Sequence, residues 1–377
     1  MNRIPVILIF DIGKTNKKFL LFNNQYDVVF ERTVQLAQQQ DEDGFECENL
    51  DLLKDWVYDS LCAAEQQYQF NIRAIHYAAY GASFVYLNQE GQVIAPLYNY
   101  LKPYKETTKK IFVERYGPMH QLCLETASPD LNGLNSGLQL FRMKIEQPEL
   151  FANVRWALHL PQYIHYLITK EVASDLTSIG CHTMLWDFTK KRYHDWVFAE
   201  GLDKILPPLK FNVGLHDSSA ALIPYQETYK EPFVLISTGT WCISLNPFNK
   251  LPLTENELNN DTLCYLSYKG QPIKASRLHA GMYYEKELAL LKSKHTESVE
   301  LDNAHDQLMN HIINEQVKST NLVLNGTNVR QIFVDGGFSK NERYMNGLKK
   351  AYSNLDVCAV GHSQASALGA AMSIHNF

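Results

Sequence analysis

The sequence predicts an α/β protein of two duplicated domains with a cleft between them. Residues 4–10 are an apolar, β-rich run, the polar stretch 11–18 follows, and a second apolar run covers 19–22, which predicts a strand, a polar turn and another strand. The same pattern of strand, polar turn and strand is repeated at 233–245, where the turn 237–240 joins two apolar runs. A chain of 377 residues also exceeds one ordinary core. The repeat therefore predicts domains at 1–228 and 229–377, divided in the polar stretch between Pro224 and Pro232.

The elements between and after these turns follow from residue periodicity. Apolar side chains recur at helical spacing over 51–68, which predicts an amphipathic helix, and 72–80 returns to strand character before Gly81. Residues 136–170 have a largely helical pattern that is interrupted near Pro148 and Pro161. In the second half, the strand pattern at 331–335 leads into a glycine turn that opens a helix ending near Lys350.

Composition and charge exclude several classes of protein. The chain is 45% hydrophobic and 20% charged, as in globular proteins, and no apolar stretch reaches the roughly 18–20 residues that span a bilayer. The apolar run after Met1 is too short for a signal peptide, and seven cysteines without a Cys-x-x-Cys pair indicate a reducing cytoplasm. A net charge of −6 argues against a nucleic-acid surface, which requires a concentrated basic face.

The first turn has the chemistry of a phosphate site. A tight turn between two strands exposes backbone N–H groups that can hold phosphate oxygens. Asp11 ends the first strand, where a carboxylate suits Mg²⁺ or its water shell. Nucleotide contacts are expected from Gly13, Lys14, Thr15, Asn16 and Lys18. An ordinary hairpin with solvated lysines is the alternative, whereas a P-loop is rejected because Leu8 replaces its first glycine and a strand follows the turn.

Two further turns, in the second half of the chain, offer similar chemistry. The turn 237–240 repeats the hydroxyl-rich phosphate turn, although plain β-hairpins also contain such turns. The paired glycines at 336–337 leave room for a flat adenosine near a helix N-terminus, unless they serve only to give the turn a positive φ. The nucleotide contacts expected here are Thr238, Gly239, Thr240, Gly336, Gly337 and Asn341.

Taken together, these segments resemble the FGGY carbohydrate kinases along nearly the whole chain. Residues 11–18 resemble the first phosphate motif of that family, 237–240 the second, 334–341 the adenosine motif and 365–371 the small-residue helix near its C-terminal end. The family's substrate-domain helices are similar to the run QLFRMKIEQPELF…LPQYIHYLITKEVASDLTS…MLWD within 139–187. The resemblance implies two ribonuclease H-like domains of the actin-like ATPase type, with Mg-ATP as phosphoryl donor and a sugar as acceptor.

The segment 214–222 resembles the one that supplies the family's catalytic aspartate, here Asp217. A sugar hydroxyl is a weak nucleophile, and a positioned carboxylate can accept its proton while the bond to phosphorus forms. A helix N-cap is the alternative role for Asp217, and the two roles are compatible.

The expected substrate contacts resemble those of the rhamnulokinase and fuculokinase branch, which implies a ketose such as a rhamnulose, fuculose or xylulose. His216 precedes the aspartate as in that branch, with a packed structural histidine as the alternative. Ala82, Ser83 and Phe84 stand where those relatives contact the sugar. Because Ala82 and Ser83 replace bulkier or acidic residues, the identity of the sugar stays open. No membrane or nucleic-acid partner is expected, and a homodimer is an open alternative.

Some residues depart from the family pattern or match no motif. Lys14 replaces a usual threonine, and Phe338 stands at the third glycine position, where it is expected to narrow the adenine slot. The chain ends at Phe377, so a shortened C-terminal domain is expected. This favours a second hypothesis, an actin-like nucleotide-binding regulatory or assembly protein without phosphotransfer, and a third, ATP hydrolysis. Neither the pair at 159 and 165 nor the pair at 181–182 has zinc-motif spacing, so no metal is expected there.

Overall fold

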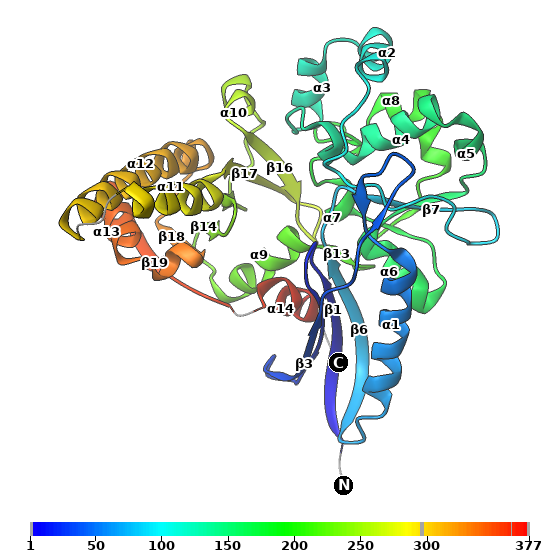
Figure 1. The fold of residues 1–377 in the computed structure, drawn as a ribbon, viewed down its shortest axis with the longest axis horizontal. Helices are drawn as coiled ribbons and strands as arrows, with labels where there is room; N and C mark the ends of the chain where they lie inside the picture. Colours follow the sequence, from blue (N-terminus) through cyan, green and yellow to red (C-terminus); the bar gives the residue numbers. More distant parts are fainter. Residues whose placement is uncertain (1–2, 295–297, 363, 375–377) are drawn as a thin grey trace. The chain divides into compact units, whose positions relative to one another are not determined.

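The computed structural model describes residues 3–294, 298–362 and 364–374 (Figure 1). The chain forms two compact units, one comprising Met1–Pro224, Tyr265–Gln271 and Gln364–Phe377, and the other comprising Tyr225–Cys264 and Pro272–Ser363. The chain therefore passes between the units several times, whereas the sequence suggested one boundary. Within the described ranges, no helix is both long and apolar enough to cross a membrane.

The first unit is built on a five-stranded sheet. Its strand order is β13 (Leu215–His216), β6 (Phe70–Ala79), β1 (Ile4–Ile12), β2 (Lys17–Phe22) and β3 (Val28–Val34). Strands β13, β6 and β1 run parallel, and β2 and β3 are antiparallel additions. The register places Ile12 and His216 each opposite Ala79, so three parallel strands end at the same level. The strands expected at 4–10, 19–22 and 72–80 are confirmed.

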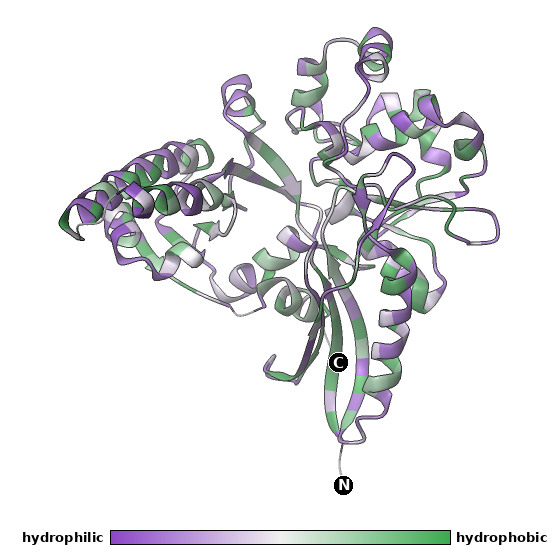
Figure 2. Ribbon diagram, viewed as in Figure 1, coloured by the Kyte–Doolittle hydropathy of each residue, from purple (hydrophilic) through white to green (hydrophobic). Residues whose placement is uncertain are grey.

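Helices cover both faces of this sheet. On one face, α1 (Leu50–Glu65) and α6 (Leu160–Thr169) pack on the apolar side chains of β1 and β6, and both hydrophobic and hydrophilic residues line α1 in Figure 2. On the other, α9 (Asp217–Thr228) and α14 (Ala365–Met372) share a core with Ile7, Ile9 and Leu215. Gly369 permits the approach of α14 to α9, because a Cβ there would lie 1.8 Å from the Ala220 carbonyl oxygen. The small-residue helix near the C-terminal end is therefore confirmed.

The remaining elements of the first unit are short. They are β4 (Gln39–Gln40), β5 (Glu46–Cys47), β7 (Phe84–Leu87), α2 (Glu106–Tyr116), α3 (Met119–Glu125), η1 (Asn132–Leu134), α4 (Ser136–Glu146), α5 (Pro148–Ala152), β8 (Trp156–His159), β9 (Ser174–Asp175), α7 (Leu176–Ile179), β10 (Trp186–Asp187), β11 (Arg192–Tyr193), α8 (Asp195–Ala199), η2 (Leu202–Lys204) and β12 (Leu209–Lys210). Pro148 and Pro161 lie in the first turns of α5 and α6. Proline is tolerated there because a backbone N–H in the first turn has no partner within the helix. The largely helical prediction for 136–170 missed β8, which pairs with the distant β7.

The second unit repeats the arrangement of the first. Its sheet order is β16 (Thr262–Leu266), β17 (Pro272–Leu278), β15 (Cys242–Asn246), β14 (Phe233–Thr238), β18 (Gln331–Gly336) and β19 (Asp356–Ala359). The end of β16, from Tyr265 onward, is counted with the first unit. As in the first unit, the central strand has an antiparallel partner on one side and a parallel partner on the other. The other elements are α10 (Glu255–Asn259), α11 (Ala280–Lys294), α12 (Ser298–Leu324), η3 (Gly337–Lys340) and α13 (Glu342–Ala351). Helices α11, α12 and α13 form one apolar core with β14 and β18.

One helix begins later than predicted. The glycine turn was expected to open a helix directly, but residues 337–340 form a 3₁₀ turn and α13 starts only at Glu342. Asn341 caps α13, since its side-chain oxygen accepts from the Tyr344 backbone N–H at 3.0 Å. The helix N-terminus therefore belongs to Asn341 and not to the paired glycines.

Candidate functional site

The predicted catalytic residue Asp217, the predicted metal ligand Asp11 and the predicted sugar contact His216 gather where the parallel strands of the first unit end. Asp11 is the next-to-last residue of β1, and Gly81 lies two residues beyond β6. His216 and Asp217 lie at the junction of β13 and α9. Parallel strands deliver their carboxyl ends to one edge of a sheet, and loops at that edge are the usual place for ligand sites in α/β folds. Residues far apart in sequence therefore meet at one edge.

Asp11 is a nearly buried carboxylate at this edge. Its side chain is 8% exposed, and Oδ2 accepts from the Ser366 hydroxyl of α14 at 3.0 Å. Burial raises the pKa of Asp11 to about 6, the Ser366 hydrogen bond opposes this rise, and the charge of Asp217 adds to it. Asp11 and Asp217 are therefore close enough to repel each other.

Asp217 is the first residue of α9, and its carboxylate contacts the adjoining residue Ser218. Its Oδ1 accepts from the Ser218 backbone N–H at 2.6 Å, and its side chain is 35% exposed. His216 Nε2 lies 3.5 Å from the same oxygen. Burial raises the pKa of Asp217 to about 6, which the Ser218 hydrogen bonds oppose. The position combines a recessed carboxylate with a helix N-terminus, which leaves a role as proton acceptor open.

The three lysines of the first turn have different surroundings. Lys17 is 1% exposed and forms an ion pair with Glu48 at 2.8 Å, and its Nζ also donates to the Lys14 carbonyl oxygen at 3.0 Å. Lys14 lies over the rings of Tyr80 and Tyr100, 5.5 and 5.7 Å from their centroids, and burial lowers its pKa. The sequence analysis did not select Lys17, which holds the turn.

Lys18 and the tip of the turn are more open. Lys18 lies opposite Asp11 on the neighbouring strand, and its Nζ donates to Gln364 Oε1 at the start of α14. Gly13 donates its N–H to the Asn16 carbonyl oxygen at 2.9 Å, which closes the turn, while Thr15 and Asn16 are exposed. A strand follows this turn, so the rejection of a P-loop is confirmed.

The segment expected to contact the sugar has buried side chains. Ser83 Oγ donates to the Tyr98 carbonyl oxygen at 3.1 Å, and Phe84 is 1% exposed. Ala82 is 3% exposed in a left-handed conformation with φ of 63°, and its carbonyl oxygen accepts from Gln139 Nε2 at 2.6 Å. These three side chains are packed inside the fold, and their burial does not support the prediction that they contact a sugar.

The predicted nucleotide turns of the second unit also lie at one sheet edge. Thr238 and Gly336 are register partners at the ends of the parallel strands β14 and β18. Thr238 Oγ1 donates to the Asp335 carbonyl oxygen at 2.6 Å and accepts from the Phe338 N–H at 3.0 Å. Gly336 has φ of 88°, and a Cβ there would lie 1.8 Å from the Thr238 carbonyl oxygen. Only glycine fits this close approach of the two turns.

Some other residues of these turns have an accessible backbone, and others are engaged in hydrogen bonds or core packing. A Cβ on Gly337 would meet nothing within 4 Å, and one on Gly239 would meet only the Trp241 carbonyl oxygen at 3.9 Å, so both backbones are accessible. The Thr240 carbonyl oxygen accepts from the Gly281 N–H at the start of α11 at 3.1 Å. Phe338 is 7% exposed and stacks on Tyr344 in the core, so the expectation that its side chain narrows a slot is wrong.

Comparisons with known proteins agree with this arrangement. Residues 6–210 match the model of the N-terminal domain of the FGGY family of carbohydrate kinases, and residues 230–326 match a carbohydrate kinase FGGY C-terminal domain. The chain belongs to the FGGY family of carbohydrate kinases. Members of that family are phosphotransferases that act on sugar hydroxyls.

Individual relatives of this FGGY chain are distant in sequence. A rhamnulokinase of Halalkalibacterium halodurans is 22% identical over 188 residues, which cover 44% of this chain and 39% of that protein. The match thus spans about two fifths of the length of this curated relative.

Solved structures show the same fold. A carbohydrate kinase from Novosphingobium aromaticivorans has a TM-score of 0.84 at 19% identity, with 98% of this chain and 91% of that chain covered. For a ligand-bound xylulose kinase from Lactobacillus acidophilus the TM-score is 0.80 at 14% identity, with 98% and 88% covered. A Plasmodium falciparum glycerol kinase with ADP gives 0.75 at 14% identity, with 98% and 89% covered. The predicted fold class, two duplicated actin-like ATPase domains, is therefore confirmed.

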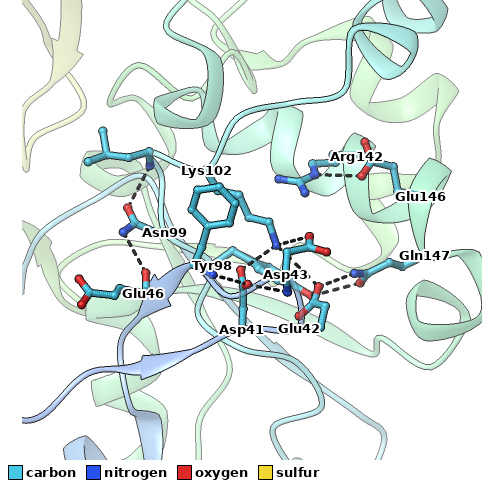
Figure 3. A network of polar contacts seen from close by, with 12 residues as sticks. Asp41, Glu42, Asp43, Glu46, Tyr98, Asn99, Lys102, Arg142, Glu146 and Gln147 are labelled. Carbon is cyan, nitrogen blue, oxygen red and sulfur yellow. Dashed lines mark hydrogen bonds and ion pairs between the residues drawn. The ribbon is translucent and has the colours of Figure 1, made fainter.

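An ionic network around the buried Lys102 joins Lys102 to the loop that follows β4. Lys102 is 3% exposed, and its Nζ lies 2.7 Å from both Asp41 Oδ2 and Asp43 Oδ2 (Figure 3). Glu42, from the same loop, accepts from Tyr98 at 2.8 Å and from Gln147 at 2.7 Å. The loop ends in Glu48, the partner of Lys17, so the network anchors the segment that supports the phosphate turn.

Proposed function

We propose that this chain transfers the γ-phosphoryl group of ATP to a hydroxyl of a sugar, a ketose of the rhamnulose, fuculose or xylulose type. The observation that carries the proposal is the position of Asp217, a recessed carboxylate at the helix N-terminus beside His216 and near Asp11. Family membership and the weak match to a rhamnulokinase support the choice of reaction and of a ketose.

In the proposed reaction, Asp217 accepts the proton of the attacking sugar hydroxyl. The bond between that oxygen and the γ-phosphorus forms while the bond to the β-phosphate oxygen breaks, which releases ADP. General-base assistance of this kind contributes about 10²–10⁴-fold. In the first unit, Lys18 and the backbone N–H groups of residues 14–16 are proposed to stabilise charge on the phosphates. The second-unit turns at 238–240 and 336–337 are proposed to bind the nucleotide.

The residues at the edge of the first-unit sheet fit a magnesium ion. Magnesium prefers oxygen ligands and keeps several of its waters, and Asp11 offers a carboxylate at the strand end. Its raised pKa reflects burial and the nearby charge of Asp217, so a divalent cation would offset an existing repulsion. When bound, the ion would neutralise phosphate charge, and Asp11 would hold it directly or through a water.

The test is the variant Asp217→Asn, which keeps the shape of the side chain and removes its basicity. Sugar-dependent ADP release, measured over a panel of ketoses, aldoses and polyols, should fall by about 10²–10⁴-fold, while ATP binding by calorimetry should persist. Asp59→Asn, which removes a carboxylate from an exposed position of α1, is the control and should retain turnover. Normal turnover by Asp217→Asn would contradict the mechanism. Nucleotide binding without turnover of any sugar by the unmodified chain would favour a regulatory or assembly protein.

A further inference from the structure

A cluster of three metal-ligand side chains lies in the first unit, next to the candidate base. One ligand atom from each of Cys181, His182 and His216 lies within 4.8 Å of the other two. Cys181 and His182 follow the short helix α7, and His216 ends β13. The pair at 181–182 matches no zinc motif because its third partner comes from a distant strand. The fold supplies that partner.

The cluster has the dimensions of a compact cation site. Cys181 Sγ lies 3.2 Å from His216 Nε2. Zinc bonds of about 2.0–2.3 Å in a tetrahedron place neighbouring ligand atoms about 3.3–3.8 Å apart. The edge between Cys181 and His216 already has about this length, and the edges to His182 must shorten by up to about 1.5 Å.

The ring of His182 is already oriented for metal binding. Its Nδ1 is 2.8 Å from the Leu134 carbonyl oxygen, which makes Nδ1 the protonated nitrogen and leaves Nε2 as the ligand atom. A backbone carbonyl in this role is a common outer-shell partner of metal-bound histidines. The backbone of His182 is held at φ of 41°, in the left-handed region, and Tyr265 stacks on the ring of His216 with centroids 5.9 Å apart.

We propose that Cys181, His182 and His216 bind a soft divalent cation of the Zn²⁺ type. Thiolate and imidazole ligands select Zn²⁺ over Mg²⁺, so the site is distinct from the magnesium position at Asp11. Asp217 Oδ1 lies 3.5 Å from His216 Nε2, close enough to meet the fourth position of a bound ion. The cation would then occupy the base that a sugar hydroxyl needs, and it would inhibit phosphoryl transfer. This second part rests on the proposed function, and the binding does not.

The binding test uses Co²⁺ as a spectroscopic substitute, titrated into the reduced full-length chain without oxygen or chelator. One equivalent should produce a thiolate-to-cobalt charge-transfer band together with the strong visible bands of four-coordinate cobalt. Cys181→Ser should abolish the charge-transfer band and weaken binding at least ~10-fold, and His182→Gln should weaken binding by a similar factor while the band remains. The control is Cys123→Ser, since Cys123 is a buried thiol outside the cluster, and it should change neither. Absence of saturable binding, or a band that survives Cys181→Ser, would overturn the site.

The inhibition test adds Zn²⁺ to turnover assays that contain excess Mg²⁺. Zn²⁺ should reduce sugar-dependent ADP release at least ~10-fold in the unmodified chain, and the concentration needed should rise at least ~10-fold in His182→Gln. Cobalt binding with undiminished turnover in Zn²⁺ would overturn the inhibitory role. Because the cobalt spectrum needs no turnover, a failure of the proposed kinase activity is distinguishable from a failure of the metal site.

Discussion

The position of His216 depends on the absence of a side chain at residue 81. A Cβ on Gly81 would lie 2.6 Å from His216 Cδ2 and 2.8 Å from His216 Nε2. Both distances are shorter than real Cβ contacts, so any larger residue displaces the imidazole. The chain turns at Gly81 directly beyond β6, and the ring of His216, from the neighbouring strand, fills the space that remains. Gly81 is therefore a positioning residue for His216.

Gly81→Ala should destabilise the fold because the added methyl group overlaps the His216 ring. We expect a loss of about 1–3 kcal/mol in the free energy of unfolding, measured by urea denaturation. In a His216→Ala background the overlap disappears, and the same substitution should cost less than about 0.5 kcal/mol. An equal loss in both backgrounds would show that the glycine serves the backbone and not the histidine.

At the scale of elements, the loop between β4 and α1 connects a buried ionic network to the first phosphate turn. The side chain of Asp41 is fully buried and forms an ion pair with Lys102. At the other end of the loop, Glu48 forms an ion pair with Lys17. A buried pair contributes little compared with an apolar replacement, but the loss of one partner leaves a charge without compensation. The network therefore makes the loop rigid at both ends.

Lys102→Met should destabilise the first unit, because it leaves the buried carboxylate of Asp41 without its cation. The expected loss is about 3–5 kcal/mol in the free energy of unfolding, measured by urea denaturation. Lys54→Met is the matched control: its ion pair with Asp51 is exposed, with side chains 39% and 87% accessible. That loss should stay below about 1 kcal/mol. If the two variants lose similar stability, the Lys102 network does not brace the loop.

At the scale of the whole molecule, buried histidines make stability depend on pH. His76 lies on β6 and is 3% exposed, and burial lowers its pKa from 6.5 to about 4, against the opposing effect of the nearby Asn212 side chain. The charge of His165 also lowers the pKa of His76. The unfolded chain takes up a proton near pH 6.5, whereas the folded chain does so only near pH 4. His76 therefore leaves the free energy of unfolding unchanged above pH 6.5, and it lowers that free energy progressively as the pH falls from 6.5 to about 4.

His76→Gln should flatten this dependence. Each pKa unit corresponds to about 1.4 kcal/mol, so the unmodified chain should lose about 2 kcal/mol through His76 between pH 7 and pH 5, and the variant should not. Urea denaturation at both pH values measures the difference. His120→Gln removes an exposed imidazole and should retain the original slope. An unchanged slope in His76→Gln would contradict the assignment.

The sequence by itself determined the local features of this protein. Spacing of apolar and polar residues predicted the strand, turn and strand units at both ends of the duplication and the amphipathic helix α1, whereas Asp217 was selected through a family resemblance of the segment 214–222. These features depend on residues close together in the chain, so periodicity and turn chemistry are sufficient to predict them. The rejection of a P-loop rested on the same local information.

Only the tertiary structure decided which of these residues meet. The parallel register of β13, β6 and β1 brings Asp11, Gly81 and His216 to one edge, and it adds His216 to Cys181 and His182. It also pairs β8 with β7, which helical periodicity concealed. Packing assigned Lys17 to the interior and left Lys18 at the edge, although both carry the same charge. Such contacts arise from strand pairing and close packing over long sequence separations, and no local pattern encodes them.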